Sequence, residues 1–534
     1  MLAGESVSVG YGSGKNVRSV SSEASVTWTL WDDLSFALFL VAVVGVSLYV
    51  SRREHSVQDY FLAGRSLTWS LIGFSLIASN ISTEQFVGMA GSSFGQAGLA
   101  IASYEWVGAA TLVFVALVLL PRFLRLGIYT MPEFLEHRYG PVPRTIMAVY
   151  MLVAYVGVAI AAVLYSGAIG LEAIFGLDLI VGIWLIGGIA GIYTIYGGLK
   201  AVVWSDLLQG LALLVGGGIV TIIGLRHVGG LSAFLDVNAA KLHMVLPADH
   251  PELPWTALLL GIWIPNLFYW GFNQFITQRT LAAKTLAQGQ RGIILAAGLK
   301  LLIPFIVVFP GIMAFQLFGS EIENGDQAYP ILIARLLPSG LRGLLFAALF
   351  GAVMSSLDSM LNSASTIYTM DIVKRWFRSG ATPGELVRTG RVTTAILVVV
   401  GCLLAPLPGR FEGVFQYIQL VWGFISPGVV TVFLVGLLVP RATATSATAA
   451  LLLGVPIYAF LLWWFPEAAF LNHMAITAGI LTIVMLSLTA ASPRAVPWRL
   501  VSVTPHLDLT PDPVARGLGA IVLVATAGLY VAFW

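Results

Sequence analysis

Long apolar stretches separated by short polar segments run through this sequence from about residue 33 to its end. A stretch of about 20 apolar residues is long enough to cross a lipid bilayer as a helix. A helix also satisfies its own backbone hydrogen bonds where no water is present. The pattern therefore predicts an all-α polytopic membrane protein with about fourteen transmembrane helices. The predicted spans are 33–50, 67–94, 96–120, 145–172, 177–195, 204–225, 254–277, 291–318, 341–373, 391–407, 412–438, 443–464, 470–490 and 514–533.

Charged residues alternate in sign from one predicted loop to the next. Loops rich in arginine and lysine stay in the cytoplasm, and here they follow the odd-numbered spans. We therefore expect a multi-pass protein of the plasma (inner) membrane with both termini on the extracellular side. The basic residues include Arg52, Arg122, Lys200, Arg279, Lys374, Arg441 and Arg494, and the acidic residues of the other loops include Asp236, Glu252 and Glu321.

Polar residues interrupt the middle of two predicted helices. The second span contains Ala-Ser-Asn-Ile-Ser-Thr-Glu-Gln at 78–85, and the ninth contains Ser-Ser-Leu-Asp-Ser at 355–359, followed by Asn362. Such residues are costly in a membrane helix, and they are retained where a helix is broken to expose carbonyls and amides to an ion or a solute. The two stripes indicate an ion-coupled transporter.

The seventh span contains another irregularity, Pro265-Asn266. It lies five spans after the polar interruption of the second span. Two irregular helices that enter from opposite sides at this spacing are typical of an inverted repeat of five helices. The predicted division of the chain is a flexible extracellular extension at 1–30, a peripheral first helix at 31–55, five-helix repeats at 56–230 and 231–440, and three peripheral C-terminal helices at 441–534.

The composition supports a membrane protein and argues against a soluble one. The chain is 58% hydrophobic and 10% charged, whereas an ordinary soluble domain is about 25% charged. We find no phosphate-binding loop, metal-ligand spacing, nucleophile elbow or basic block, so neither an enzyme nor a nucleic-acid partner is expected. The partners expected are the lipid bilayer, ions and a small solute, and nothing requires an oligomer. A channel or a sensor without coupled transport is the alternative, although no continuous polar stripe lines a pore.

Motifs spread from about residue 58 to 438 resemble those of the sodium/solute symporter family, above all the sodium/glucose cotransporters and their bacterial sodium/galactose relative. The resemblance implies a LeuT-like 5+5 core with broken first and sixth helices, and sodium-coupled import of a sugar such as glucose or galactose by alternating access. A polyol, sialic acid or an amino acid on the same scaffold is the alternative. The matching segments are 78–89, 102–106, 197–206, 266–270, 278–279, 299–300, 354–357, 369–371 and 415–419.

The resemblance also implies a sugar site. Its polar members offer hydrogen bonds to sugar hydroxyls, Tyr269 stacks on the ring as an inner gate, and Met89, Tyr104 and Phe415 form an outer hydrophobic lid. Glu105 and Lys300 could instead be a plain buried ion pair. Gly108 stands where the galactose symporter has a serine, so one hydroxyl contact is expected to be missing. The polar members are Asn80, Gln85, Glu105, Asn266, Lys300 and Gln419.

One sodium site is implied by the same resemblance, with the carbonyls of Ala78, Ile81 and Ala352 and the hydroxyls of Ser355 and Ser356 as ligands. A serine pair in a membrane helix can also merely pack.

A second cation is a further expectation, because Asp358 and Ser359 lie three and four residues after Ser355 and share its helix face. With Asp206 they would hold a second sodium. A shared proton is one alternative, and a structural carboxylate bonded to arginine or backbone is another. The ion requirement is thus one sodium, or two.

Overall fold

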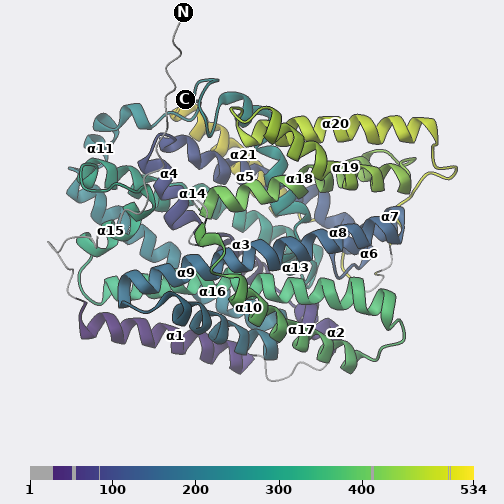
Figure 1. The fold of residues 1–534 in the computed structure, drawn as a ribbon, viewed down its shortest axis with the longest axis horizontal. Helices are drawn as coiled ribbons and strands as arrows, with labels where there is room; N and C mark the ends of the chain where they lie inside the picture. Colours follow the sequence, from purple (N-terminus) through teal and green to yellow (C-terminus); the bar gives the residue numbers. More distant parts are fainter. Residues whose placement is uncertain (1–27, 51–55, 83, 411–413, 503, 505–506) are drawn as a thin grey trace, which may run out of the picture.

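The computed structural model describes residues 28–50, 56–82, 84–410, 414–502, 504 and 507–534. These residues form helices and no strand. The long helices lie alongside one another, horizontally in Figure 1, and short helices gather at the two ends. At one end lie α11 (Leu231–Val237) and α15 (Ala328–Leu336), and at the other lie α2 (Val57–Leu62), α6 (Leu120–Leu126) and α7 (Met131–Tyr139).

Eleven helices of the described part are long and apolar enough to cross a membrane, which confirms an all-helical polytopic membrane protein. These helices are α1 (Leu30–Val50), Gly98–Leu126, which contains α5 (Ser103–Phe114), Pro141–Glu172, α10 (Leu179–His227), α14 (Leu286–Phe318), Leu341–Phe377, which begins with α16 (Leu341–Ile367), α17 (Pro383–Leu404), α18 (Val414–Leu438, from Ile418 in the described side chains), α19 (Ala444–Trp464), α20 (Phe470–Ala491) and α21 (Pro513–Ala532).

The predicted fifth and sixth spans form one element, α10, which bends at Gly198. Gly198 has φ +49° and ψ −150°, a backbone conformation open to glycine and strained for other residues. A Cβ atom there would also lie 2.3 Å from the carbonyl oxygen of Tyr60. The close approach of α2 thus depends on this glycine. The other two predicted spans outside the eleven are the interrupted ones, 67–94 and 254–277, and the count of fourteen stays a prediction.

The second predicted span is broken, as expected. Its first half, α3 (Trp69–Asn80), ends at Ile81, which is extended with φ −81° and ψ 103°. The chain resumes as a π-helix, η2 (Glu84–Met89), followed by α4 (Ala90–Phe94). The last carbonyls of α3 therefore have no partners farther along the helix.

The seventh predicted span is also broken, but not at its proline. Pro265 and Asn266 lie within α12 (Trp263–Leu267), between the π-helical turns η7 (Ala257–Gly261) and η8 (Phe268–Phe272). A π-helical turn already shifts the hydrogen-bond ladder, so the missing N–H of a proline is tolerated there. The chain becomes extended at Asn273, with φ −82° and ψ 125°, and then forms α13 (Gln274–Leu281). The break thus comes after the segment that the sequence indicated.

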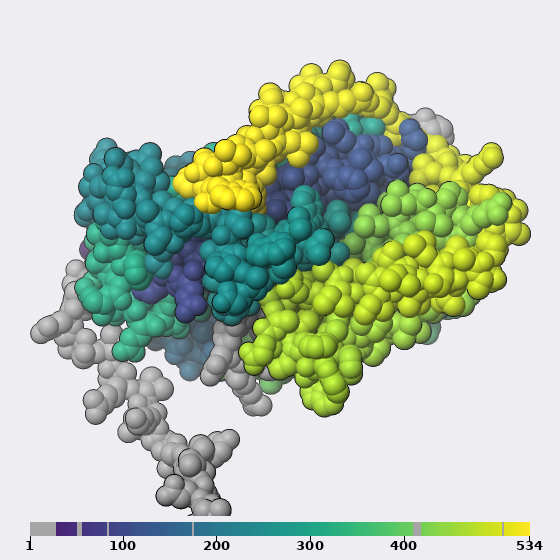
Figure 2. Space-filling model, turned by 90° about the horizontal axis from the view of Figure 1, so that it is seen from above, coloured from purple at the N-terminus to yellow at the C-terminus, as the bar shows by residue number. Residues whose placement is uncertain are grey.

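The C-terminal helices lie on the outside of the molecule (Figure 2). The helices α19 and α20, in yellow-green, pack on α18, and α21, in yellow, lies along another edge against α5 and α14. The predicted boundaries of the two repeats stay predictions, and residues 1–27 of the expected N-terminal extension lie outside the described residues.

Replacing Gly198 with alanine is expected to destabilise the protein by more than about 1 kcal/mol, because alanine is strained at this φ and its Cβ meets Tyr60. The measurement is the melting temperature of the purified protein in detergent. Gly218→Ala is the matched control on the same helix, since a Cβ there meets nothing within 4 Å. Equal melting temperatures for the two variants would contradict the steric argument.

Candidate solute and cation sites

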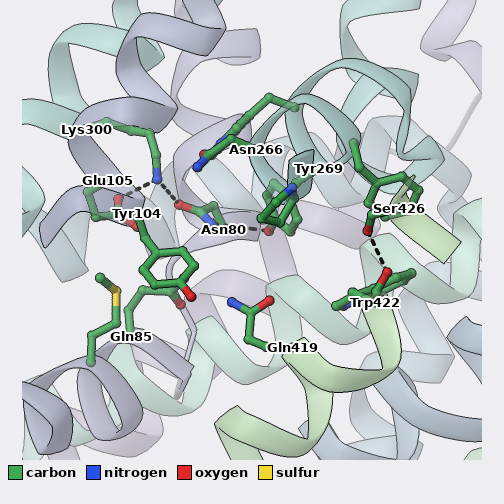
Figure 3. A pocket seen from close by; sticks show the side chains of 14 residues that line it. Asn80, Gln85, Tyr104, Glu105, Asn266, Tyr269, Lys300, Gln419, Trp422 and Ser426 are labelled. Carbon is green, nitrogen blue, oxygen red and sulfur yellow. Dashed lines mark hydrogen bonds and ion pairs between the residues drawn. The ribbon is translucent and has the colours of Figure 1, made fainter. Parts of the chain in front are cut away.

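A pocket lies where the two broken helices meet α5, α14 and α18 (Figure 3). Nine of the ten residues predicted for the sugar site line it, and the side chain of the tenth, Phe415, lies outside the described residues. Their contact with a sugar stays a prediction. The nine are Asn80, Gln85, Met89, Tyr104, Glu105, Asn266, Tyr269, Lys300 and Gln419, and the pocket residues that the prediction missed are Pro265, Phe268, Trp270, Trp422 and Ser426.

A chain of polar contacts runs along one wall of this pocket. The amine of Lys300 forms an ion pair with Glu105, donates a hydrogen bond to Asn80 Oδ1 at 2.8 Å, and lies 4.7 Å from the ring centre of Trp270. Asn80 in turn donates to the hydroxyl of Tyr269 at 3.2 Å. The ion pair that the sequence left as an alternative is therefore present. Its members are buried, yet they line the pocket and can also face a solute.

Gln419 lies across the pocket from this wall, and Figure 3 shows its amide turned toward the open space. Polar groups thus face the space from two sides, and aromatic side chains lie between them. A polar solute held here would meet hydrogen-bonding groups on both sides.

Gly108 sits behind the wall, where a Cβ would lie 3.0 Å from Lys300 Cε and from Asn266 Oδ1, and 3.1 Å from Trp270 Nε1. The space that a serine would use is therefore filled by these three side chains. Glycine allows α5 to approach α14 and brings Lys300 close to Glu105. Glycine in place of the serine of the galactose symporter therefore changes the packing of the wall as well as removing a hydroxyl.

Tyr269 separates the pocket from a second, smaller cavity. It lines both spaces, as do Asn80 and Trp422. Its ring packs edge-on against Phe275, with the centroids 5.4 Å apart. The smaller cavity is also lined by Ser79, Ser82, Phe275, Ser356 and Met360. This placement at the boundary of the two spaces suits the gate that the resemblance implied.

Of the residues predicted for the first sodium, Ser356 lines the smaller cavity, and the hydroxyl of Ser355 donates to Asp206 instead. The hydroxyl of Ser356 donates to the carbonyl oxygen of Ser79 at 3.2 Å, which brings α16 against the carboxyl end of α3. Ala352 precedes Ser356 by one turn and is fully buried, as are Ala78 and Ile81. Free carbonyls at the end of a helix attract cations. The arrangement suits a cation between α3 and α16, and its coordination stays a prediction.

The residues predicted for a second cation surround a guanidinium. Arg279, at the end of α13, is fully buried and donates to the hydroxyls of Ser79 and Ser359, each at 2.7 Å, and to Asp206 at 3.2 Å. Its Nε donates to Ser75 at 2.6 Å. The sequence placed Arg279 among the basic residues of a loop, which is wrong, because this arginine is buried inside α13. The structural alternative, a carboxylate bonded to arginine, therefore describes Asp206 in this structure.

Asp358 lies on the same face of α16 as Ser355 and Ser359, as their spacing predicted, but its surroundings differ from those of Asp206. It accepts a hydrogen bond from the hydroxyl of Tyr193 at 2.6 Å and a longer one from Ser359 at 3.4 Å. Ser355, in contrast, donates to Asp206 at 2.5 Å. These residues lie where α10 packs against α16.

A family model described as the sodium:solute symporter family matches residues 60–454. The chain is 40% identical to the sodium/glucose cotransporter of Vibrio parahaemolyticus, over 94% of this chain and 98% of that protein. It is 36% identical to the uncharacterized symporter YidK of Escherichia coli, with 93% and 90% covered, and 36% identical to the human sodium/myo-inositol cotransporter 2, with 79% and 67% covered.

One solved structure shares the fold with a TM-score of 0.79 and 23% sequence identity, over 89% of this chain and all of the other. It is described as the substrate-bound outward-open state of a sodium-coupled sialic acid symporter. At this identity the similarity concerns the fold alone. It agrees with the LeuT-like architecture that the sequence predicted.

Proposed function

The chain belongs to the sodium:solute symporter family and is a membrane transporter rather than an enzyme, and we propose that it imports a hexose such as glucose or galactose together with sodium. The observation that supports this solute most is the pocket, where nine polar, aromatic and apolar residues of the predicted sugar site come together. The 40% identity to a sodium/glucose cotransporter over nearly the whole chain supports it further.

The chemistry of the pocket suits a sugar. Hydroxyl groups of a hexose both donate and accept, and the pocket offers the Glu105 carboxylate, the Lys300 amine and the amides of Gln85 and Gln419. Buried polar groups of a solute need such partners, since each unpaired one costs about 1–3 kcal/mol. Tyr269 offers an aromatic face to the apolar side of the ring. On sugar binding, some of the polar contacts that Lys300 makes with Glu105 and Asn80 would be replaced by contacts with sugar hydroxyls.

Sodium drives the import in this proposal. The first ion is held by the carbonyls of Ala78, Ile81 and Ala352 and the hydroxyls of Ser355 and Ser356, and it joins α3 to α16 in the outward-facing state. Each sodium that moves inward contributes about 2.3 kcal/mol per 100 mV of membrane potential. A second cation at Asp358, near Asp206 and Ser359, would double this contribution. Both termini lie outside the plasma membrane.

A polyol is the second candidate solute. It is favoured by the similarity to sodium/myo-inositol cotransporters, which are 36% identical over 79% of this chain. A polyol presents the same hydroxyl groups and could use the same wall of the pocket. Gly108, which replaces a serine of the galactose symporter, lies behind this wall. The preference between a hexose and a cyclic polyol is therefore expected to depend on the residue at position 108.

Uptake into proteoliposomes tests the proposal. Purified protein would be given radiolabelled glucose, galactose, myo-inositol, sialic acid and proline, with and without an inward sodium gradient. We expect accumulation of a hexose only when sodium is present outside. Accumulation of myo-inositol alone would replace the hexose with a polyol, and accumulation of sialic acid or proline alone would contradict the sugar proposal.

Ser356→Ala is expected to raise the sodium concentration for half-maximal uptake roughly fivefold. The variant loses one hydroxyl ligand, worth about 1 kcal/mol, and little volume. Ser365→Ala on the same helix is the control, because that hydroxyl donates to the carbonyl of Gly390 instead. Unchanged sodium activation in Ser356→Ala would remove this residue from the site.

A further inference from the structure

Five aromatic side chains form a closed circle where the pocket meets the smaller cavity. Phe268 packs against Trp422 with the ring centroids 5.4 Å apart, and Trp422 packs against Tyr155 at 6.0 Å. Tyr155 packs against Phe275 at 6.1 Å, Phe275 packs against Tyr269 at 5.4 Å, and Tyr269 follows Phe268 in the chain. Phe268 lines the pocket, Phe275 lines the smaller cavity, and Tyr269 and Trp422 line both. These five residues, the aromatic barrier, therefore lie at the boundary of the two spaces.

Tyr155 is the described member of the aromatic barrier that lines neither space. It is fully buried in η5 (Tyr155–Ala159), a π-helical turn within the span Pro141–Glu172. Its hydroxyl donates to Asn273 Oδ1 and accepts from the backbone N–H of Phe275 at 3.2 Å. Both contacts lie where the seventh predicted span breaks. One hydroxyl thus uses its donor and an acceptor position on the same break.

The hydroxyl of Tyr155 takes the place of the usual helix cap at the start of α13. The first N–H groups of a helix have no partner within it, and an asparagine just before the first turn commonly accepts one with its side chain. Asn273 occupies this position, but in the described structure its side chain does not cap the helix. Its amide oxygen accepts from Tyr155 instead, which lies 118 residues away in the sequence. The start of α13 is therefore held by a residue of another span.

The two hydrogen bonds connect the break to the aromatic barrier. Phe275 supplies the N–H that Tyr155 accepts and also the ring that packs against Tyr269. Asn273 is extended between η8 and α13, and such a residue at the end of a helical element can absorb a change in backbone angles. A turn of α13 about Asn273 would break the bonds to Tyr155 and move Phe275 away from Tyr269. The bonds thus stabilise the closed barrier.

We propose that Tyr155 is a positioning residue for solute passage: its hydroxyl holds the start of α13 while the aromatic barrier is closed, and passage requires that it release Asn273 and Phe275. This inference rests on the proposed solute transport and concerns the step after binding. Tyr155 contacts no solute in this step. The affinity of the pocket should therefore depend little on the hydroxyl, whereas the equilibrium between closed and open barrier depends on it directly.

Tyr155→Phe tests this role, because it removes the hydroxyl and keeps the aromatic ring. Loss of bonds that exist only in the closed state should shift the barrier toward the open state roughly tenfold. Proteoliposomes loaded with the labelled solute that the unmodified protein accumulates should then release it into sodium-free medium roughly tenfold faster. Calorimetric solute affinity at saturating sodium should change less than about twofold. The control is Tyr150→Phe in α8 (Pro141–Ala154), whose hydroxyl donates to the carbonyl of Leu451 at 3.3 Å, and neither quantity should change in it.

A cysteine at position 360 provides a measurement that needs no solute. Met360 lines the smaller cavity and is 5% exposed, and Cys402, the single cysteine of the sequence, is buried. The purified Met360→Cys protein in detergent with sodium would be treated with a charged thiol reagent. We expect its labelling to be roughly tenfold faster when it is combined with Tyr155→Phe, and unchanged when it is combined with Tyr150→Phe.

The outcomes separate this role from a structural one and from the proposed function. Unchanged efflux and labelling in Tyr155→Phe, with only a lower melting temperature, would make the hydroxyl a structural contact and overturn the inference. A large loss of solute affinity with unchanged efflux would place Tyr155 in the pocket instead. If Tyr155→Phe fails to fold, Asn273→Ala removes one of the two bonds and should show smaller changes in the same direction; no change there also overturns the inference. Absence of transport by the unmodified protein contradicts the proposed function, whereas the labelling difference does not depend on transport.

Discussion

Lys300→Ala is expected to weaken sugar binding by about 10- to 100-fold while sodium binding changes little. A hydrogen bond to a charged group contributes about 1.5–3 kcal/mol, and 1.4 kcal/mol corresponds to a factor of ten in affinity. The variant loses the amine that contacts Glu105 and Asn80 on the pocket wall. The measurement is calorimetric titration of the purified protein with sugar at saturating sodium.

The controls for Lys300 separate the pocket from the fold. Lys284→Ala removes the same side chain from an exposed position and should leave sugar affinity unchanged. Gln419→Ala should weaken binding less, by about two- to tenfold, because its bonds to a sugar are not charge-assisted. Native sugar affinity in both Lys300→Ala and Gln419→Ala would show that the solute binds elsewhere.

The ion pair itself introduces a second effect. Removing Lys300 leaves Glu105 buried without its partner, which typically costs about 3–5 kcal/mol of stability. A combined Glu105→Gln, Lys300→Ala variant should recover part of that stability and none of the sugar affinity. Recovery of both would mean that the pair only supports the fold.

The sequence predicts those features that depend on local patterns. Apolar runs of membrane length indicate the helices, and polar residues within such a run indicate the break after Asn80. The pocket residues follow from motifs, because segments shared with a family keep their places in a common fold. In these cases the information lies within a few neighbouring residues.

Other features depend on contacts between distant segments. Gly198 allows α2 to approach the bend in α10 closely, whereas the sequence alone shows only a glycine between two predicted spans. Proline is the visible irregularity of the seventh span, yet the chain opens at Asn273, whose side chain contacts the hydroxyl of Tyr155. Asp206 and Arg279 are 73 residues apart, so their pairing could not be derived from spacing.

Arg279→Gln is expected to destabilise the protein by about 3–5 kcal/mol, because it leaves Asp206 as a buried charge without a partner. Glutamine also cannot maintain the hydrogen bonds that the guanidinium donates to Ser75, Ser79 and Ser359. These bonds connect α3, α13 and α16, so their loss should loosen the region around the first sodium site. Thermal unfolding in detergent, with and without sodium, measures both effects.

A double-mutant cycle decides whether the charge of Asp206 is the cause. If it is, Asp206→Asn in the Arg279→Gln background should restore stability, since two neutral side chains can bond to each other without an unpaired charge. Arg335→Gln is the surface control: its pair with Glu321 is partly exposed, and pairs of that kind contribute about 0–1 kcal/mol. An additive cycle, in which the second substitution restores nothing, would show that Arg279 acts through its serine contacts alone. A restored cycle would show that Arg279 neutralises Asp206, which leaves Asp358 as the carboxylate available to a second ion.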